Sequence, residues 1–224
     1  MVKISPSVLS ADFAHLADEL AATKAAGTDM LHVDIMDGVY VPNQSMGVPV
    51  VKSMRKVSDL FFDVHLMCAK PSWLVELYAK AGADLITIHV ETESDKTEEI
   101  LKDIRAKGCK AGLALDPDTP IEEVLKYLPL LDLVLVMTVK SGFGGQKFRP
   151  ELLSKVEAVY EEAKRQGRDD LIIQVDGGIN PETIALAAAA GATCFVAGSA
   201  VYDKPDYKEA ISALRASAEA ALRA

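Results

Sequence analysis

The sequence contains few residues that would form covalent or aromatic anchors. Among its 224 residues there are three cysteines and one tryptophan, and aromatic residues make up 6%. Cys68, Cys109 and Cys194 are far apart and form no CxxC pair. This spacing argues against a disulfide framework or a thiolate zinc site and fits free thiols in a reducing compartment. No apolar run approaches the ~20 residues of a membrane span, so we expect no association with a membrane.

Positive charge is also scarce. Lysine and arginine total 24 against 33 aspartates and glutamates, which gives a net charge of −9. This balance disfavours nucleic acid as a partner, whereas a small phosphate needs only a local set of N–H donors. The first residues lack the layout of a signal peptide, so we expect a cytoplasmic protein. The length favours one domain, residues 1–224.

Short apolar runs alternate with helical patterns along the whole chain. Strands are expected at 2–9, 30–36, 61–67, 85–90, 110–115, 133–139, 171–176 and 193–197. Helices are expected at 13–26, 48–57, 71–81, 95–107, 120–127, 151–166, 181–190 and 206–223. Strict alternation with short connections predicts parallel strands and right-handed crossovers. Eight such units predict an α/β fold, a closed (β/α)8 TIM barrel, with an open doubly wound sheet as the alternative. The repeated AGAD and AGAT at 81–84 and 190–193 mark transitions from helix to strand.

Four ionisable residues interrupt these apolar runs. His32 and Asp34 share one face of the second strand because strand side chains alternate with period 2. His65 and Asp176 lie at the ends of the third and seventh strands. Buried charges are paired or bound to a metal, and histidine with aspartate suits zinc, iron, cobalt or manganese. The four residues therefore predict a divalent metal site, whereas four separately buried core residues would be unusual.

Other residues at the strand ends allow two interpretations. His89 ends the fourth strand and is a candidate for a fifth ligand, but without a carboxylate on its own face we expect it to pack in the core or behind a metal ligand. Met36, Met67 and Met137 end the second, third and sixth strands. They are either core residues or a soft, water-poor wall that stabilises a reactive intermediate.

Glycines follow the sixth, seventh and eighth strands. The run Ser141-Gly-Phe-Gly-Gly-Gln146 permits positive φ and close backbone approach, which suits a lid or an anion cradle. Gly177-Gly178 and Gly198-Ser199 occupy the two loops where (β/α)8 barrels often bind phosphate. These pairs predict a phosphate site.

Several stretches together resemble the ribulose-phosphate 3-epimerase family. They are SPSVLSADF (5–13), LHVDIMDG (31–38), VPN (41–43), FDVHLM (62–67), VMTV (136–139), GFGGQKF (142–148), VDGGI (175–179) and GSA (198–200). They span almost the whole chain in the family's order. The resemblance implies interconversion of D-ribulose 5-phosphate and D-xylulose 5-phosphate by a homo-oligomeric (β/α)8 barrel.

The resemblance also implies roles for single residues. One divalent ion per subunit, with zinc or iron favoured over cobalt or manganese, would be held by His32, Asp34, His65 and Asp176. Asp34 would accept the substrate proton, and Asp176 would donate one in the same direction. Residues expected to contact the substrate are Ser7, His65, Gly142, Phe143, Gly144, Gly145, Asp176, Gly177, Gly178, Gly198 and Ser199.

Inversion at a carbon needs a proton removed from one face and another delivered to the other face. Two carboxylates from different strands supply this, provided that one is ionised while the other holds a proton. How Asp176 would keep its proton beside a metal is not evident from the sequence.

One departure from the family precedes the lid. The family commonly has Glu-Pro before GFGG, whereas this chain has Lys140-Ser141. Loss of the proline is expected to loosen the lid, and the lysine to alter substrate capture.

Three other functions remain open. A 3-epimerase of a six-carbon ketose phosphate, such as D-allulose 6-phosphate, would use the same residues. Orotidine-phosphate decarboxylase-like barrels rely on an Asp-x-Lys-x-x-Asp cluster, and the corresponding residues 32–37 contain no lysine. A non-catalytic module that binds metal or sugar phosphate would need no acids on opposite faces of its ligand.

Overall fold

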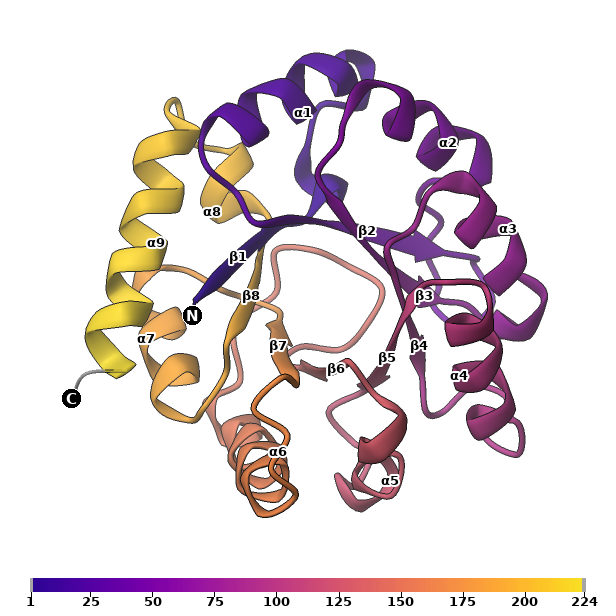
Figure 1. Ribbon diagram of the computed structural model, residues 1–224. Helices are drawn as coiled ribbons and strands as arrows, with labels where there is room; N and C mark the ends of the chain where they lie inside the picture. Colours follow the sequence, from indigo (N-terminus) through magenta and orange to yellow (C-terminus); the bar gives the residue numbers. More distant parts are fainter. Residues whose placement is uncertain (1, 223–224) are drawn as a thin grey trace.

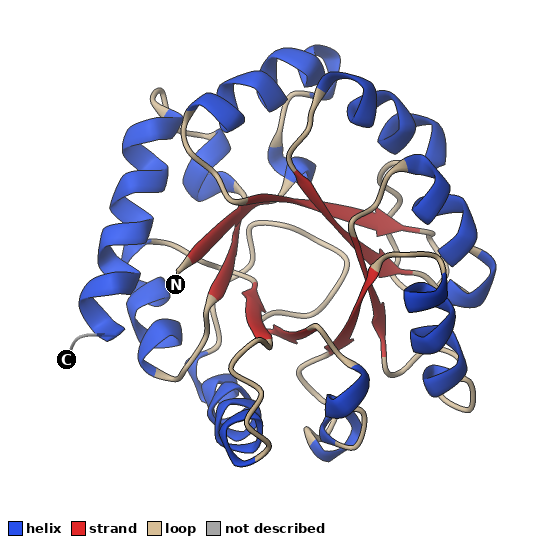
Figure 2. Ribbon diagram, viewed as in Figure 1, coloured by secondary structure: helices blue, strands red, loops and turns tan. Residues whose placement is uncertain are grey.

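A computed structural model describes residues 2–222. Eight parallel strands form a barrel inside a ring of helices (Figures 1 and 2), which confirms the predicted (β/α)8 architecture. Hydrogen-bonded neighbours run in the order β1-β8-β7-β6-β5-β4-β3-β2, and a bridge between Ser7 and His32 joins the two remaining strands. The strands are β1 (Lys3–Pro6), β2 (Met30–Met36), β3 (Phe61–Met67), β4 (Leu85–His89), β5 (Lys110–Leu115), β6 (Leu133–Met137), β7 (Ile172–Asp176) and β8 (Cys194–Ala197).

Helices connect successive strands and cover the outside of the barrel. They are α1 (Leu16–Ala25), α2 (Val48–Val57), α3 (Val75–Ala81), α4 (Thr97–Ala106), α5 (Glu122–Leu125), α6 (Leu153–Arg165), α7 (Pro181–Ala189), α8 (Ser199–Tyr202) and α9 (Tyr207–Leu222). None of the helices within residues 2–222 is long and apolar enough to cross a membrane.

Several predicted boundaries were wrong. The first strand ends at Pro6 instead of residue 9, because the Ser7 hydroxyl accepts the Leu9 N–H (3.3 Å) and starts a 3-10 turn at Val8–Ser10. The helices expected from residues 13, 71 and 151 begin with 3-10 turns at Phe13–His15, Pro71–Trp73 and Pro150–Leu152. The helix expected at 120–127 has only four residues, Glu122–Leu125. Residue 223 of the last predicted helix lies outside the described range.

The barrel interior has an apolar side and a polar side. Leu85, Ala114, Leu133, Leu135 and Met137 of β4, β5 and β6 pack together there and are at most 2% exposed. The opposite faces of the strands pack against the helices in the main core. The polar side faces inward from β2, β3 and β7, so the ionisable residues cluster on one side of the interior.

A repeated clamp closes the other end of the barrel. The residue just before each even-numbered strand makes two hydrogen bonds with one residue near the start of the preceding strand. Its side chain accepts the N–H of that residue, and its own N–H donates to the carbonyl of that residue. The side-chain bonds join Ile4 to Asp29 (2.8 Å), Phe62 to Asp84 (2.7 Å), Ala111 to Asp132 (2.9 Å) and Ile173 to Thr193 (3.1 Å). Arg215, Arg55 and Arg105 pair with the three aspartates. Two of the clamps end the AGAD and AGAT stretches, which explains that repeat.

Replacing Asp132 with alanine should destabilise the fold. Ala111 is fully buried, so its N–H would lose its partner while Arg105 lost its carboxylate. An unsatisfied buried donor costs about 1–3 kcal/mol. Urea denaturation should show that decrease in the free energy of unfolding. Asp59→Ala is the control, because the exposed Asp59–Lys24 pair is worth about 0–1 kcal/mol. Equal stability of the two variants would contradict the clamp.

Candidate active site

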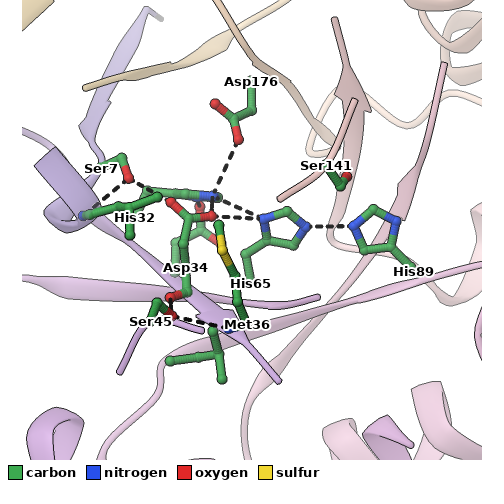
Figure 3. Close-up of polar contacts among 12 residues, drawn as sticks. Ser7, His32, Asp34, Met36, Ser45, His65, His89, Ser141 and Asp176 are labelled. Atoms are coloured by element: carbon green, nitrogen blue, oxygen red, sulfur yellow. Dashed lines mark hydrogen bonds and ion pairs between the residues drawn. The ribbon is translucent and has the colours of Figure 1, made fainter. Parts of the chain in front are cut away.

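Four side chains converge at the mouth of the barrel. His32 Nε2 lies 3.2 Å from Asp34 Oδ1, 3.3 Å from His65 Nδ1 and 4.0 Å from Asp176 Oδ2. His65 Nδ1 is 3.1 Å from Asp34 Oδ1. Figure 3 shows Asp176 reaching this group from the side opposite to Asp34. The structure therefore brings together all four residues that the sequence predicted to form a metal site.

The donor set fits a divalent cation. One ligand atom from each residue can be chosen so that all four lie within 4.8 Å of one another. Ligands at about 2.0–2.2 Å from a tetrahedral ion would be about 3.4 Å apart. The measured separations bracket that value, and two imidazoles with two carboxylates form a mixed N and O ligand set typical of zinc or iron.

A second carboxylate orients His32. Asp63 is fully buried, and its Oδ2 accepts His32 Nδ1–H at 2.8 Å and Gln174 Nε2–H at 2.6 Å. With its Nδ1 proton held by Asp63, His32 presents the lone pair of Nε2 to the centre of the group. Such a carboxylate–histidine pair sets the tautomer and raises the basicity of a metal ligand.

His65 is held from behind by another histidine. His65 Nε2 lies 2.8 Å from His89 Nε2, and His89 Nδ1 lies 3.1 Å from Glu91 Oε2. When His65 Nδ1 presents its lone pair to the group, His65 donates to His89 and His89 donates to Glu91. His89 thus packs behind a candidate ligand, as the sequence predicted, but the expectation that no carboxylate accompanies it was wrong, because Glu91 lies two residues further on.

The two aspartates of the group differ in their electrostatic surroundings. Burial opposes ionisation of Asp34, but the nearby His32 and hydrogen bonds from His32 and His65 hold its pKa far below its usual value. The Ser7 hydroxyl also donates to Asp34 Oδ2 at 2.5 Å. Burial and the negative charge of Asp34 instead raise the pKa of Asp176 to about 7. One carboxylate is therefore ionised at neutral pH while the other readily holds a proton.

The imidazoles also differ from each other. Burial lowers the pKa of His65 to about 4. Burial acts in the same direction on His32, but Asp34 and Asp63 outweigh it and raise its pKa well above the usual value. A cation at the centre of the group would therefore compete with a proton for His32.

A cavity of about 1000 Å³ opens above the group. Its lining includes most of the predicted substrate and intermediate contacts, namely Ser7, Asp34, Met36, Met67, Met137, Gly142, Phe143, Gly144, Gly145, Asp176, Gly177, Gly178, Gly198 and Ser199. His32 and His65 are fully buried beneath it and do not belong to the lining. Met36 and Met67 form an apolar cluster with Val41 at the mouth.

The glycines after β7 and β8 allow the chain to approach its neighbours closely. A Cβ atom at Gly178 would lie 2.5 Å from the backbone nitrogen of Phe148, and one at Gly198 would lie 2.5 Å from Ser10 Oγ. Gly178 also has φ +67°. Gly178 is thus required by packing against the Phe148 backbone at the edge of the cavity, whereas the close neighbour of Gly198 is the Ser10 hydroxyl.

Sequence reasoning missed three residues that support the group. Asp63 and Gln174 each precede a predicted site residue by two positions, so the period-2 pattern that placed His32 beside Asp34 could have found them. Ser45 gave no such signal. Its hydroxyl donates to the Asp34 carbonyl at 2.5 Å and accepts the Met36 N–H at 3.0 Å, and thereby holds the end of β2.

The chain is similar to known proteins over almost its whole length. A model of the ribulose-phosphate 3 epimerase family matches residues 3–202. The chain is 50% identical over 218 residues to ribulose-phosphate 3-epimerase of Mycobacterium tuberculosis, covering 97% of this chain and 93% of that protein. It is 49% identical over 220 residues to the cytoplasmic isoform of Oryza sativa subsp. japonica, covering 97% and 94%. The Bacillus subtilis enzyme is 46% identical over 219 residues, covering 97% and 100%.

More distant proteins share the fold. The solved 3-keto-L-gulonate-6-phosphate decarboxylase of Vibrio cholerae O1 superposes with a TM-score of 0.72 at 15% identity and covers 98% of both chains. Likeness at that identity shows the barrel alone. Because the family model and the three relatives span nearly the whole chain, the resemblance seen in the sequence is confirmed, and this chain belongs to the ribulose-phosphate 3-epimerase family.

Proposed function

We propose that this protein interconverts D-ribulose 5-phosphate and D-xylulose 5-phosphate by inverting C3 with two aspartates. The observation that carries the proposal is the meeting of Asp34 and Asp176, which come from different strands and reach the group of ligands from opposite sides (Figure 3). The relatives at 46–50% identity are all named for this activity. They favour the five-carbon ketose over the six-carbon alternative.

The reaction begins with Asp34, which removes the C3 proton. Its low pKa keeps it ionised, and the Ser7 hydroxyl fixes the orientation of its carboxylate by donating to Oδ2. Asp176 delivers a proton to the opposite face of the planar enediolate. The two residues exchange roles in the reverse direction, because each then starts in the state in which the forward reaction left it.

The surrounding residues stabilise the charge that develops. One divalent cation, with zinc or iron favoured, would be held by His32, Asp34, His65 and Asp176. When bound, this cation supplies Lewis-acid stabilisation of the enediolate. Met36, Met67 and Met137 line the cavity and exclude water, which strengthens electrostatic interactions within it.

The loops after β7 and β8 would bind the substrate phosphate. Gly177, Gly178, Gly198 and Ser199 line the same cavity as the two aspartates, so one ligand can reach both. Binding energy from the phosphate would position C3 between the acids.

Asp34→Asn and Asp176→Asn should each abolish epimerisation of well-folded protein. The loss of a positioned acid or base costs about 10²–10⁴-fold in rate. In deuterated water, Asp176→Asn should still replace the C3 proton of ribulose 5-phosphate with deuterium, because Asp34 remains, but it should not invert C3. Asp34→Asn should instead replace only the C3 proton of xylulose 5-phosphate. NMR measures both. Asp59→Asn is the control, and bound metal is assayed alongside. Wild-type turnover by either active-site variant refutes the two-base scheme.

Asp63→Asn should weaken cation binding without removing a ligand. The change keeps the side-chain shape but removes the charge behind His32, and changes of this kind typically cost about 10–100-fold in metal affinity. Competition with a fluorescent chelator measures the dissociation constant of zinc. Asp132→Asn, at the opposite end of the barrel, should bind zinc as the wild type does. An unchanged constant for Asp63→Asn would contradict the role of this residue.

Unphosphorylated D-ribulose should be a poor substrate. Losing two charge-assisted hydrogen bonds at about 1.5 kcal/mol each lowers kcat/KM by about a hundredfold. Steady-state kinetics on both sugars measures the ratio. Equal efficiency would show that the glycine loops do not bind a phosphate.

A further inference from the structure

The glycine-rich loop after β6 lies across the mouth of the barrel (Figures 1 and 2). Gly142, Phe143, Gly144 and Gly145 from this loop line the cavity. The tip is loosely packed, since Phe143 is 54% exposed and a Cβ atom at Gly144 or Gly145 would meet nothing within 4 Å. The position of the loop must therefore be set at its base.

The base is attached to Asp116, the residue that follows β5. Ser141 Oγ donates to Asp116 Oδ1 at 2.5 Å, and the Ser141 N–H reaches the same oxygen at 3.3 Å. Lys140 Nζ donates to Asp116 Oδ2 at 2.6 Å. Lys140 and Ser141, which make these bonds to Asp116, are the two residues that stand where the family commonly has Glu-Pro. A proline at 141 would have neither the N–H nor the hydroxyl.

Asp116 is itself held rigidly. Its N–H donates to Glu91 Oε1 at 2.7 Å. Lys155 of α6 donates to the carbonyls of residues 116, 117 and 119 at 2.6–3.2 Å. Burial raises the pKa of Asp116, but hydrogen bonds from Lys140 and Ser141 outweigh this and keep it below its usual value. The carboxylate is thus an ionised, fixed acceptor.

Further along, the loop has its own supports. Asn43 Nδ2 donates to the Gly142 carbonyl at 3.2 Å, and Gly142 has φ +117° with Val41 where a Cβ would lie. Gln146 Nε2 donates to the carbonyls of Lys140 (2.6 Å) and Phe143 (2.9 Å), which closes the loop on its own base. If the base moves, the tip moves with it.

Given the function proposed above, we propose that Asp116 is a positioning residue for substrate capture: through Ser141 and Lys140 it fixes the base of the loop so that residues 142–145 close over the ketose phosphate. In this chain, hydrogen bonds supply the constraint that a proline ring would supply at position 141. The loosening expected from the loss of that proline is thereby offset.

The two attachments should contribute unequally. Ser141 and Asp116 are each 4% exposed, so their hydrogen bond is shielded from water. The Lys140 side chain is 64% exposed, and exposed ion pairs contribute little. Ser141→Ala should therefore have a larger effect than Lys140→Met.

Two measurements on the metal-loaded protein test the proposal. Amide hydrogen exchange without substrate should be about tenfold faster at 141–146 in Asp116→Ala and Ser141→Ala. If only about a tenth of the molecules then hold the loop in place, KM for ribulose 5-phosphate rises about tenfold, with kcat within about twofold. Asp116→Asn, which keeps one acceptor for Ser141, should lie between wild type and Asp116→Ala and guards against a folding defect in the latter. Lys102→Met on α4, which breaks an exposed pair with Glu98, should change neither quantity.

A double-mutant cycle separates the attachment from two unrelated effects. If Ser141 acts through Asp116, the double variant Asp116→Ala, Ser141→Ala should have the KM of Asp116→Ala alone. Unchanged exchange at 141–146, an unchanged KM, or additive effects would each overturn the proposal. A wild type that fails to epimerise ketose phosphates would refute the proposed function instead, and the exchange experiment would still decide whether Asp116 anchors the loop.

Discussion

The mouth of this barrel depends on burying two imidazoles and two carboxylates beside one another. Such a group is stable only when its charges are balanced and its remaining polar atoms are hydrogen-bonded. Asp63 and His89 hold the far nitrogens of His32 and His65, while the raised pKa values of His32 and Asp176 show that protons supply part of the balance. Ligand atoms of His32, Asp34, His65 and Asp176 are thereby held close enough together to bind one divalent cation.

The residues of this group lie on one side of the barrel interior, because the other side is filled by apolar side chains. Leucines of β4 and β6 fill the interior opposite the ionisable group, so the polar residues of β2, β3 and β7 face one another across a short distance. Met36, Met67 and Met137 at the strand ends are buried and line the same cavity as the two aspartates. The glycine loops after β7 and β8 line the cavity on the same side as Asp176.

Periodicity in the sequence was enough to predict the barrel and its four central residues. The bounds of β2, β3, β5 and α2 agree with the expected ranges, because a buried strand or an amphipathic helix has a strong local pattern. The end of β1 was missed because the side chain of Ser7 turns the chain after a strand-like run. Asp116 could not have been identified, since in Asp-Pro-Asp it resembles any turn residue. Its role arises from contacts with residues 24 and 25 positions away.

The clamps at the bottom of the barrel have a consequence for how the chain can be divided. Each ties an odd-numbered strand to the next even-numbered one, so a cut in the α4–β5 connection would sever none of them. The first clamp takes its arginine, Arg215, from α9 at the other end of the chain. Two half-barrels made by such a cut would therefore each retain their own strand pairs, and Arg215 would complete its ion pair with Asp29 only when the halves reassemble.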